Sequence, residues 1–243
     1  MVHWPEVLFS FEQTEKVLFS ADAFGKFGIY DADPADWACE ARRYYFNIVG
    51  KYGNQVQAVL KKVAPLGVKT ICPLHGPVLA ENLEYYIGKY NTWSSYAPED
   101  QGVLVAYASI YGHTAKAAQV LAKALEGAGV PKVVVSDLAR SDMAEVIEDA
   151  FRYDRMVVMA PTYDAGLFPV MEDFLNHLKA KNYSNRKVGI VENGTWAPMA
   201  AKKMTEILST LKNVTLCETT VTVKSSLSAE SLAALKQLAK ELA

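Results

Sequence analysis

Three short segments in the second half of the chain carry residue types that can bind a phosphate and a flat aromatic ring. They are Ser109-Ile-Tyr-Gly-His-Thr114, Pro161-Thr-Tyr-Asp-Ala-Gly-Leu-Phe-Pro169 and Asn193-Gly-Thr-Trp196. Each segment directly follows a short apolar run that predicts a β-strand. If those strands are parallel, the three segments meet at the carboxyl edge of one sheet, where α/β proteins bind their ligands.

The first segment has the composition of a phosphate-binding turn between a strand and a helix. Ser109 and Thr114 place hydroxyls at its two ends, Gly112 lies inside it, and it contains no Lys or Arg. Backbone N–H groups and the N-terminus of a helix beginning near Thr114 would then bind a phosphate monoester. The segment matches neither the G-x-x-x-x-G-K-[ST] loop nor the dinucleotide pattern G-x-G-x-x-G. An ordinary polar turn is the alternative interpretation.

The other two segments suit a ring. Pro161 and Pro169 stiffen the loop between them, and Gly166 would allow its backbone to approach a ligand closely. Tyr163 and Trp196 could pack against the ring, although a role in the protein core is the alternative for such aromatic side chains. A phosphate site and a ring site at one sheet edge together predict bound flavin mononucleotide (FMN).

The elements that must position these segments alternate regularly. Apolar runs predict strands at 103–107, 133–135, 156–160, 188–191 and 214–223. Helical periodicity predicts helices at 114–125, 144–151, 170–178, 199–211 and 229–242. We therefore expect an α/β fold for residues 102–243, a flavodoxin-like, doubly wound, five-stranded parallel sheet with helices on both faces.

The first ninety residues predict a less complete αβ region. The pattern indicates a hairpin at 7–11 and 16–20, a helical stretch at 37–62 broken near Gly50 or Gly53, a strand at 70–72 and a helix at 83–90. Residues 91–102 are polar and turn-rich and predict a linker. The expected domains are thus 1–95 and 102–243.

Composition excludes several classes of function. A formal charge of −2 gives no reason to expect nucleic acid or an anionic membrane as a partner. No apolar run approaches the roughly 20 residues of a membrane span, and the first residues do not have the pattern of a secretory signal. Three scattered cysteines without a C-x-x-C pair fit reduced thiols. We expect a cytoplasmic protein.

The three segments, the last of them extended to Glu192–Pro198, resemble the cofactor loops of flavodoxin-like domains. They are most similar to those of the flavodiiron proteins, also called A-type flavoproteins. This resemblance implies that the first segment binds the phosphate and that the other two surround the isoalloxazine ring. The implied FMN residues are Ser109, Tyr111, Gly112, His113, Thr114, Pro161, Thr162, Tyr163, Asp164, Gly166, Asn193, Gly194, Thr195 and Trp196.

The first half resembles the metallo-β-lactamase-like domain that precedes the flavodoxin-like domain in that family. The segments 3–5, 20–25 and 73–77 look like its last three ligand motifs, which would make His3 and His75 terminal iron ligands and Asp22 the bridging carboxylate. The family's H-x-[DE]-x-D-H cluster is absent from the sequence. We therefore expect an N-terminally truncated domain that does not hold iron tightly on this chain alone, because two protein ligands per iron are too few.

The resemblance implies an oxidoreductase that transfers electrons through FMN from a rubredoxin-like protein or a reductase. It also implies a homo-oligomer such as a head-to-tail homodimer, or pairing with a complementary chain. Two alternatives remain open: an oxygen or nitric oxide reductase whose di-iron site is completed by another chain, and a non-catalytic flavodoxin-like interaction scaffold. A hydrolase is the weakest alternative, because the β-lactamase-like metal cluster is missing.

Overall fold

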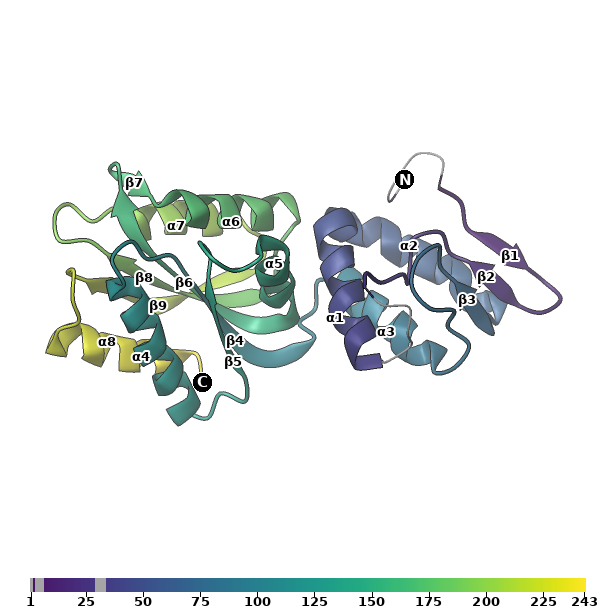
Figure 1. Cartoon of the computed structure of the whole chain (residues 1–243), viewed down its shortest axis with the longest axis horizontal. Coiled ribbons are helices and arrows are strands. Elements are labelled where there is room, and N and C mark those ends of the chain that lie inside the picture. Colours follow the sequence, from purple (N-terminus) through teal and green to yellow (C-terminus); the bar gives the residue numbers. More distant parts are fainter. Residues whose placement is uncertain (1, 3–6, 29–33) are drawn as a thin grey trace. The chain divides into compact units, whose positions relative to one another are not determined.

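The structure is a computed structural model that describes residues 2, 7–28 and 34–243 (Figure 1). It divides the chain into two compact units, Met1–Ala97 and Pro98–Ala243. In the part of the chain that the structure describes, no helix is both long and apolar enough to cross a membrane.

The second unit is built on a parallel sheet with the strand order β5-β4-β6-β8-β9. This order confirms the predicted flavodoxin-like, doubly wound, five-stranded sheet. The strands are β4 (Asp100–Tyr107), β5 (Val133–Asp137), β6 (Tyr153–Tyr163), β8 (Arg186–Asn193) and β9 (Val214–Val223).

Five helices cover the two faces of this sheet, with α4 and α8 on one face and α5, α6 and α7 on the other (Figure 1). Between the sheet and the α4–α8 pair lies a dry core that includes Val105, Leu121, Val157 and Leu235, each with no exposed surface. The helices are α4 (His113–Gly127), α5 (Met143–Arg152), α6 (Pro169–Ala180), α7 (Ala200–Leu208) and α8 (Ala229–Glu241).

The register of the sheet brings the ends of its strands together. Pro161 of β6 pairs with Asn193 of β8, which pairs in turn with Val223 of β9. On the other side of β6, Met159 pairs with Tyr107, the last residue of β4. The segments at the ends of β4, β6 and β8 therefore lie side by side at one edge, as the sequence predicts, and the loop after β9 begins beside them.

The segment 161–169 differs from the rigid loop that its two prolines predict. Strand β6 continues to Tyr163 and folds back as β7 (Gly166–Leu167), forming a small antiparallel hairpin. Asp164 and Ala165 form its two-residue turn, with φ of 46° and 55°. These angles are those of a type I′ turn, which twists to match its strands. The residues that must adopt a positive φ are therefore Asp164 and Ala165, and not Gly166. A Cβ on Gly166 would make only ordinary contacts.

The first unit contains a three-stranded sheet of order β1-β2-β3, with β1 antiparallel and β3 parallel to β2. The helical stretch of this unit is interrupted near Gly50 and Gly53, as predicted, by a short π-helix and a short 3-10 helix. Helix α3 reaches Ser94, so much of the predicted linker 91–102 is helix or strand. The elements are β1 (Ser10–Glu12), β2 (Val17–Phe19), α1 (Pro34–Tyr44), η1 (Tyr45–Val49), η2 (Gly50–Tyr52), α2 (Gly53–Val63), η3 (Ala64–Leu66), β3 (Thr70–Cys72) and α3 (Leu83–Ser94).

Aromatic side chains hold the helices of this unit together. Trp37 of α1 stacks on Trp93 of α3 with ring centroids 5.8 Å apart, and both are buried. The Trp37 indole N–H donates to the Phe24 carbonyl at 3.0 Å, and the Phe24 N–H donates to the Tyr90 hydroxyl at 2.7 Å. These two bonds tie the loop after β2, which contains Asp22, to the helical layer.

Candidate functional site

A pocket of about 330 Å³ opens at the carboxyl edge of the five-stranded sheet. It is formed by the end of β6 and by the loops after β4, β8 and β9, so residues from four separate stretches of the chain meet there. The residues that line it are Ser109, Ile110, Tyr111, His113, Thr114, Pro161, Thr162, Asn193, Gly194, Thr195, Trp196 and Ser225.

The loop after β4 presents the N-terminus of helix α4 to this pocket. Gly112 precedes the helix with φ of +87°, and no side chain of the described residues caps the helix start. The Ser109 hydroxyl accepts from the Gly112 N–H at 3.1 Å, which closes the turn, and Thr114 is 2% exposed. A helix end whose N–H groups lack side-chain acceptors is suited to an anion.

By contrast, helix α7 at the same edge has its N-terminus satisfied by side chains from the sheet. The Thr162 hydroxyl accepts from the N–H of Met199 at 2.8 Å and of Ala200 at 3.2 Å. The Glu192 carboxylate accepts from the Ala201 N–H at 2.9 Å. The starts of α4 and α7 therefore differ, because protein side-chain oxygens accept from the first N–H groups of α7 and, among the described residues, no side chain caps α4.

Both polar groups of the Asn193 side-chain amide form hydrogen bonds with the backbone of Ser225. Its Nδ2 donates to the Ser225 carbonyl at 3.0 Å, and its Oδ1 accepts from the Ser225 N–H at 3.1 Å. The Gly194 N–H donates to the Val223 carbonyl at 3.0 Å. Asn193 thus joins the end of β8 to the loop after β9.

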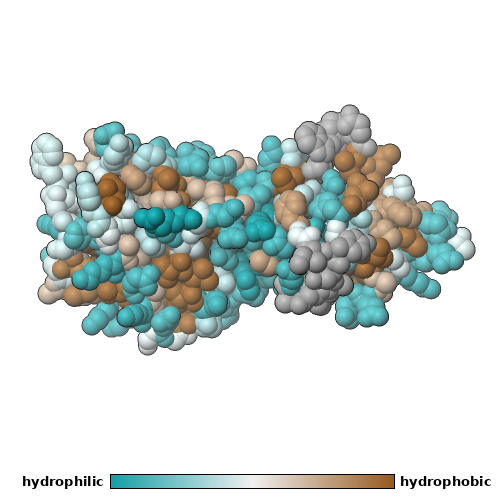
Figure 2. Space-filling view, viewed as in Figure 1, coloured by the Kyte–Doolittle hydropathy of each residue, from teal (hydrophilic) through white to brown (hydrophobic). Residues whose placement is uncertain are grey.

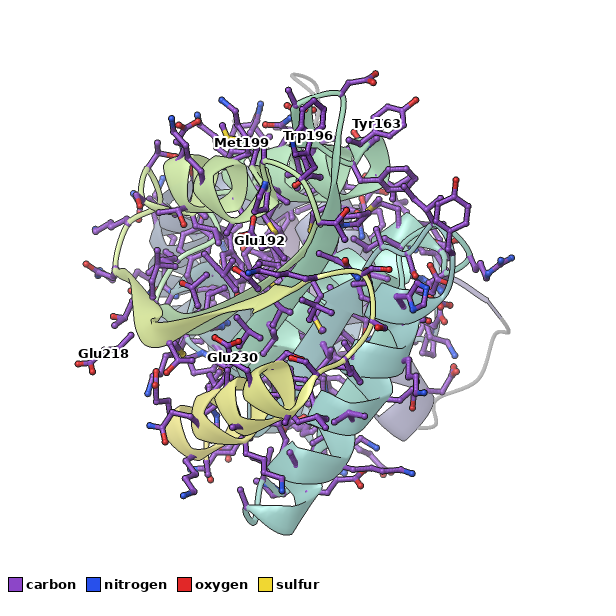
Figure 3. The ribbon with its side chains drawn as sticks, turned by 90° about the vertical axis from the view of Figure 1, so that its left-hand side faces the viewer. Tyr163, Glu192, Trp196, Met199, Glu218 and Glu230 are labelled. Atoms are coloured by element: carbon purple, nitrogen blue, oxygen red, sulfur yellow. The ribbon has the colours of Figure 1, made fainter. Side chains whose placement is uncertain are left out.

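Large aromatic side chains stand exposed at the rim of the pocket. Trp196 is 91% exposed, Tyr111 87% and Tyr163 45%. Figure 3 shows Trp196 and Tyr163 projecting outward at the same end of the sheet. The Tyr163 ring packs edge-on against Phe168 with centroids 5.6 Å apart. The core role considered for Trp196 and Tyr163 is thereby wrong, because neither ring is buried.

The pocket gathers most, but not all, of the residues expected from the sequence. Gly112, Tyr163, Asp164 and Gly166 do not line it, although the first borders the α4 turn and the others form the neighbouring hairpin. Ser225 and Ile110 line it without having been expected. Ser225 lies just after the strand predicted at 214–223. The end of that strand could therefore have indicated that Ser225 lies at the same sheet edge.

The first unit brings together two of the three expected metal ligands. The His75 Nε2 lies 3.8 Å from the Asp22 Oδ1, while its Nδ1 lies 3.0 Å from the Lys26 carbonyl oxygen. The backbone of Gly25 passes so close that a Cβ there would lie 2.5 Å from His75 Cε1. His3 lies outside the described residues.

Tyr44 closes this site, with its ring edge-on to His75 at a centroid distance of 5.0 Å. Burial, and then the nearby Asp22 carboxylate, raise the pKa of the Tyr44 phenol above its ordinary value. In the described residues, no group of three or more His, Cys, Asp or Glu side chains lies close enough to hold a metal ion. Within the described ranges, the expected ligands present are therefore one imidazole and one carboxylate.

Comparisons with known proteins agree with this architecture. A family model described as a flavodoxin domain matches residues 104–223. The chain is 28% identical to a nitric oxide reductase of Moorella thermoacetica over 255 residues, which is all of this chain and 62% of that protein.

Solved structures extend the match to both units. A rubredoxin oxygen:oxidoreductase from Desulfovibrio gigas has a TM-score of 0.91 and 25% identity, covering all of this chain and 62% of that one. The flavodiiron protein from Giardia intestinalis has a TM-score of 0.89 and 20% identity, covering 99% of this chain and 61% of that one. The chain belongs to the flavodiiron protein family. Its first unit is the metallo-β-lactamase-like part of that fold, and the chain spans about three fifths of the length of these relatives.

FMN is the cofactor that this flavodiiron protein's flavodoxin domain implies, and the pocket fits it. The open helix start at α4 has the chemistry of a phosphate site, and the exposed rim aromatics offer faces to a planar ring. The second unit therefore has both parts of a flavin nucleotide site. Iron is less well matched, because the described residues of this flavodiiron protein bring only Asp22 and His75 together.

Proposed function

We propose that this chain is an FMN-binding electron-transfer protein of the flavodiiron type. The observation that carries the proposal is the combination of an uncapped α4 N-terminus with exposed aromatic rings at one pocket. Bound FMN would supply the redox chemistry, accepting electrons and passing them on. Its electron donor would be a rubredoxin-like protein or a reductase.

Within this proposal, the chain's own residues bind and orient the cofactor. The Ser109–Thr114 turn holds the phosphate through N–H groups and hydroxyls. Thr195 and the backbone around Gly194 would offer hydrogen bonds to the polar edge of the ring, and the neighbouring hairpin would bring Tyr163 and Asp164 near it. The exposed side chains of Trp196 and Tyr111 would cover ring surface and so exclude water.

The test is an equilibrium titration of the purified protein with FMN, followed by quenching of flavin fluorescence, with riboflavin as the matched ligand that lacks the phosphate. We expect saturable binding of FMN and weaker binding of riboflavin. If neither flavin binds and the purified protein is colourless, the interaction-scaffold alternative replaces this proposal.

We further propose that this chain alone does not hold two irons tightly. The described donor set of His75 and Asp22 falls short of the three or more protein ligands usual for a catalytic metal. Iron analysis after anaerobic loading with Fe²⁺ and desalting tests this. Two retained irons per chain would contradict it.

The surface of the first unit favours a second candidate function. In this function the chain would join a complementary chain, and the assembly would reduce oxygen or nitric oxide. An apolar groove of about 440 Å³ runs beside β1, one of the two edge strands of the described three-stranded sheet. Leu8 is 77% exposed there, and Figure 2 shows hydrophobic surface gathered around β1 and β2. An apolar groove beside a free strand edge favours association.

Size-exclusion chromatography with light scattering measures that association. We expect a homodimer or larger assembly when the chain is alone. The second candidate function additionally requires that co-expression with a chain carrying H-x-E-x-D-H yields a complex that retains iron and reduces oxygen or nitric oxide.

A further inference from the structure

Glu192 is a buried carboxylate close to the flavin pocket that does not line it. It is the penultimate residue of β8, is 7% exposed, and lies below Trp196 in Figure 3. The residue after it, Asn193, reaches the pocket. A buried carboxylate needs hydrogen-bond donors, so its partners indicate what it holds in place.

The two oxygens of Glu192 bind two different elements. Oε2 accepts from the Ala201 N–H of α7 at 2.9 Å, and Oε1 accepts from the Thr222 hydroxyl of β9 at 2.9 Å. A negative charge at a helix N-terminus is favoured by the helix dipole. Glu192 therefore fixes the start of α7 to the end of the sheet.

The loop that carries Trp196 runs between Asn193 and this helix start. At its first end, Asn193 is tied to Ser225. At its last end, Met199 and Ala201 are tied to the sheet through Thr162 and Glu192. Because Trp196 itself is 91% exposed, packing of its ring does little to place it. The position of Trp196 is set by these anchors.

We propose that Glu192 is a positioning residue for the flavin site. It orients the Trp196 loop by capping α7, and it thereby sets FMN affinity and the surroundings of the ring without touching the cofactor. This inference rests on the proposed function, because it assumes that FMN occupies the pocket.

The chain offers a matched control in Glu241 of α8. Like Glu192, its carboxylate accepts from a β9 threonine hydroxyl and a backbone N–H, both from Thr219. It lies near the opposite end of β8, since the carbonyl of Glu241 accepts from Lys187. Loss of the Glu241 carboxylate removes comparable bonds far from the pocket.

The experiment compares wild type, Glu192→Gln, Glu192→Ala and Glu241→Ala. For each protein we would measure the FMN dissociation constant, the visible circular dichroism of bound flavin at saturation, and the thermal midpoint without flavin. Visible circular dichroism reports the asymmetric surroundings of the ring, which general destabilisation does not alter.

We expect Glu192→Ala, which removes both hydrogen bonds of the carboxylate, to raise the FMN dissociation constant about tenfold, the factor that follows if the unanchored Trp196 loop holds its binding conformation only about a tenth of the time. We expect Glu192→Gln, which keeps one acceptor oxygen, to fall between Glu192→Ala and wild type. Both should change the circular dichroism of bound flavin, while Glu241→Ala should lower the thermal midpoint and leave affinity and spectrum unchanged.

Equal changes in affinity for the Glu192 and Glu241 variants, or an unchanged flavin spectrum in Glu192→Gln, would overturn the inference. Failure of the proposed function looks different, because wild type itself would then bind no FMN. If Glu192→Ala does not fold, Glu192→Gln and Thr222→Val carry the same comparison, since each weakens a single bond.

Discussion

Asn193 and Ser225 exchange two hydrogen bonds, at 3.0 and 3.1 Å, that join the loops after β8 and β9 beside the pocket. Asn193 is 8% exposed, so water does not readily replace these bonds. One side chain thus holds a pocket wall that two separate strands supply.

Replacing Asn193 should therefore affect both folding and cofactor binding. We expect Asn193→Ala to lower the free energy of unfolding by about 1–2 kcal/mol, because it removes two part-buried hydrogen bonds to the Ser225 backbone. Asn193→Asp should be at least as costly, because it places a carboxylate oxygen against the Ser225 carbonyl. Urea denaturation of the flavin-free proteins measures this, and an unchanged midpoint in both variants would contradict the assignment.

The turn before α4 should control recognition of the phosphate. Thr114→Val keeps the side-chain volume but removes the hydroxyl, and we expect it to weaken FMN binding by roughly 1–3 kcal/mol, the range for a hydrogen bond to a charged group. Riboflavin binding should change little, because riboflavin has no phosphate. An equal loss for both flavins would place the phosphate elsewhere.

Gly112 should be required for the shape of that turn. Its φ of +87° is accessible to glycine at little cost, whereas alanine there costs about 1–3 kcal/mol. A Cβ would meet no neighbouring atom within 4 Å, so the penalty is conformational and not steric crowding. We expect Gly112→Ala to weaken FMN binding, measured by titration, and Gly127→Ala, inside α4, to leave it unchanged.

Trp196 should contribute to FMN affinity and not to the stability of the fold. It is 91% exposed, so Trp196→Ala should leave the thermal midpoint of the flavin-free protein nearly unchanged. Loss of a stacking partner should weaken FMN binding by about 1 kcal/mol or more. Trp196→Phe is the matched control and should retain most of the affinity. A fall in thermal midpoint without loss of affinity would contradict a role at the ring.

Alkaline pH should destabilise the second unit through Tyr183. Burial raises the pKa of this phenol above its ordinary value, and its hydroxyl has no hydrogen-bond partner within the described ranges. An unfolded tyrosine loses its proton near pH 10 while the native one does not. Its contribution to stability is therefore intact below about pH 9 and is lost as pH rises further.

We expect Tyr183→Phe to be as stable as wild type or more so, by up to about 1 kcal/mol, because it removes a buried hydroxyl without a partner. It should also lose less stability between pH 9 and 11. Some loss should remain, because burial also raises the pKa of Cys217 to about 11. Thermal midpoints measured across this pH range test both points.

The sequence predicts the strands and helices of the second unit well because buried parallel strands are short apolar runs between amphipathic helices. Strand β9 has the predicted bounds, Val214–Val223. The hairpin after β6 is missed, because Asp164-Ala165 lacks the glycine that usually signals a two-residue turn. At the site, the order of motifs predicts which loops meet. The order of motifs does not predict that the side chains of Thr162 and Asn193 form hydrogen bonds within the protein, because the partners of these side chains depend on strand register.

The proposed function requires that the pocket at the sheet edge binds FMN. Isothermal titration calorimetry of the flavin-free protein tests this binding. We expect one FMN site per chain, with FMN binding tighter than riboflavin and with FMN affinity weakened by Thr114→Val. No heat of binding from a folded protein, or equal affinity for FMN and riboflavin, would contradict it.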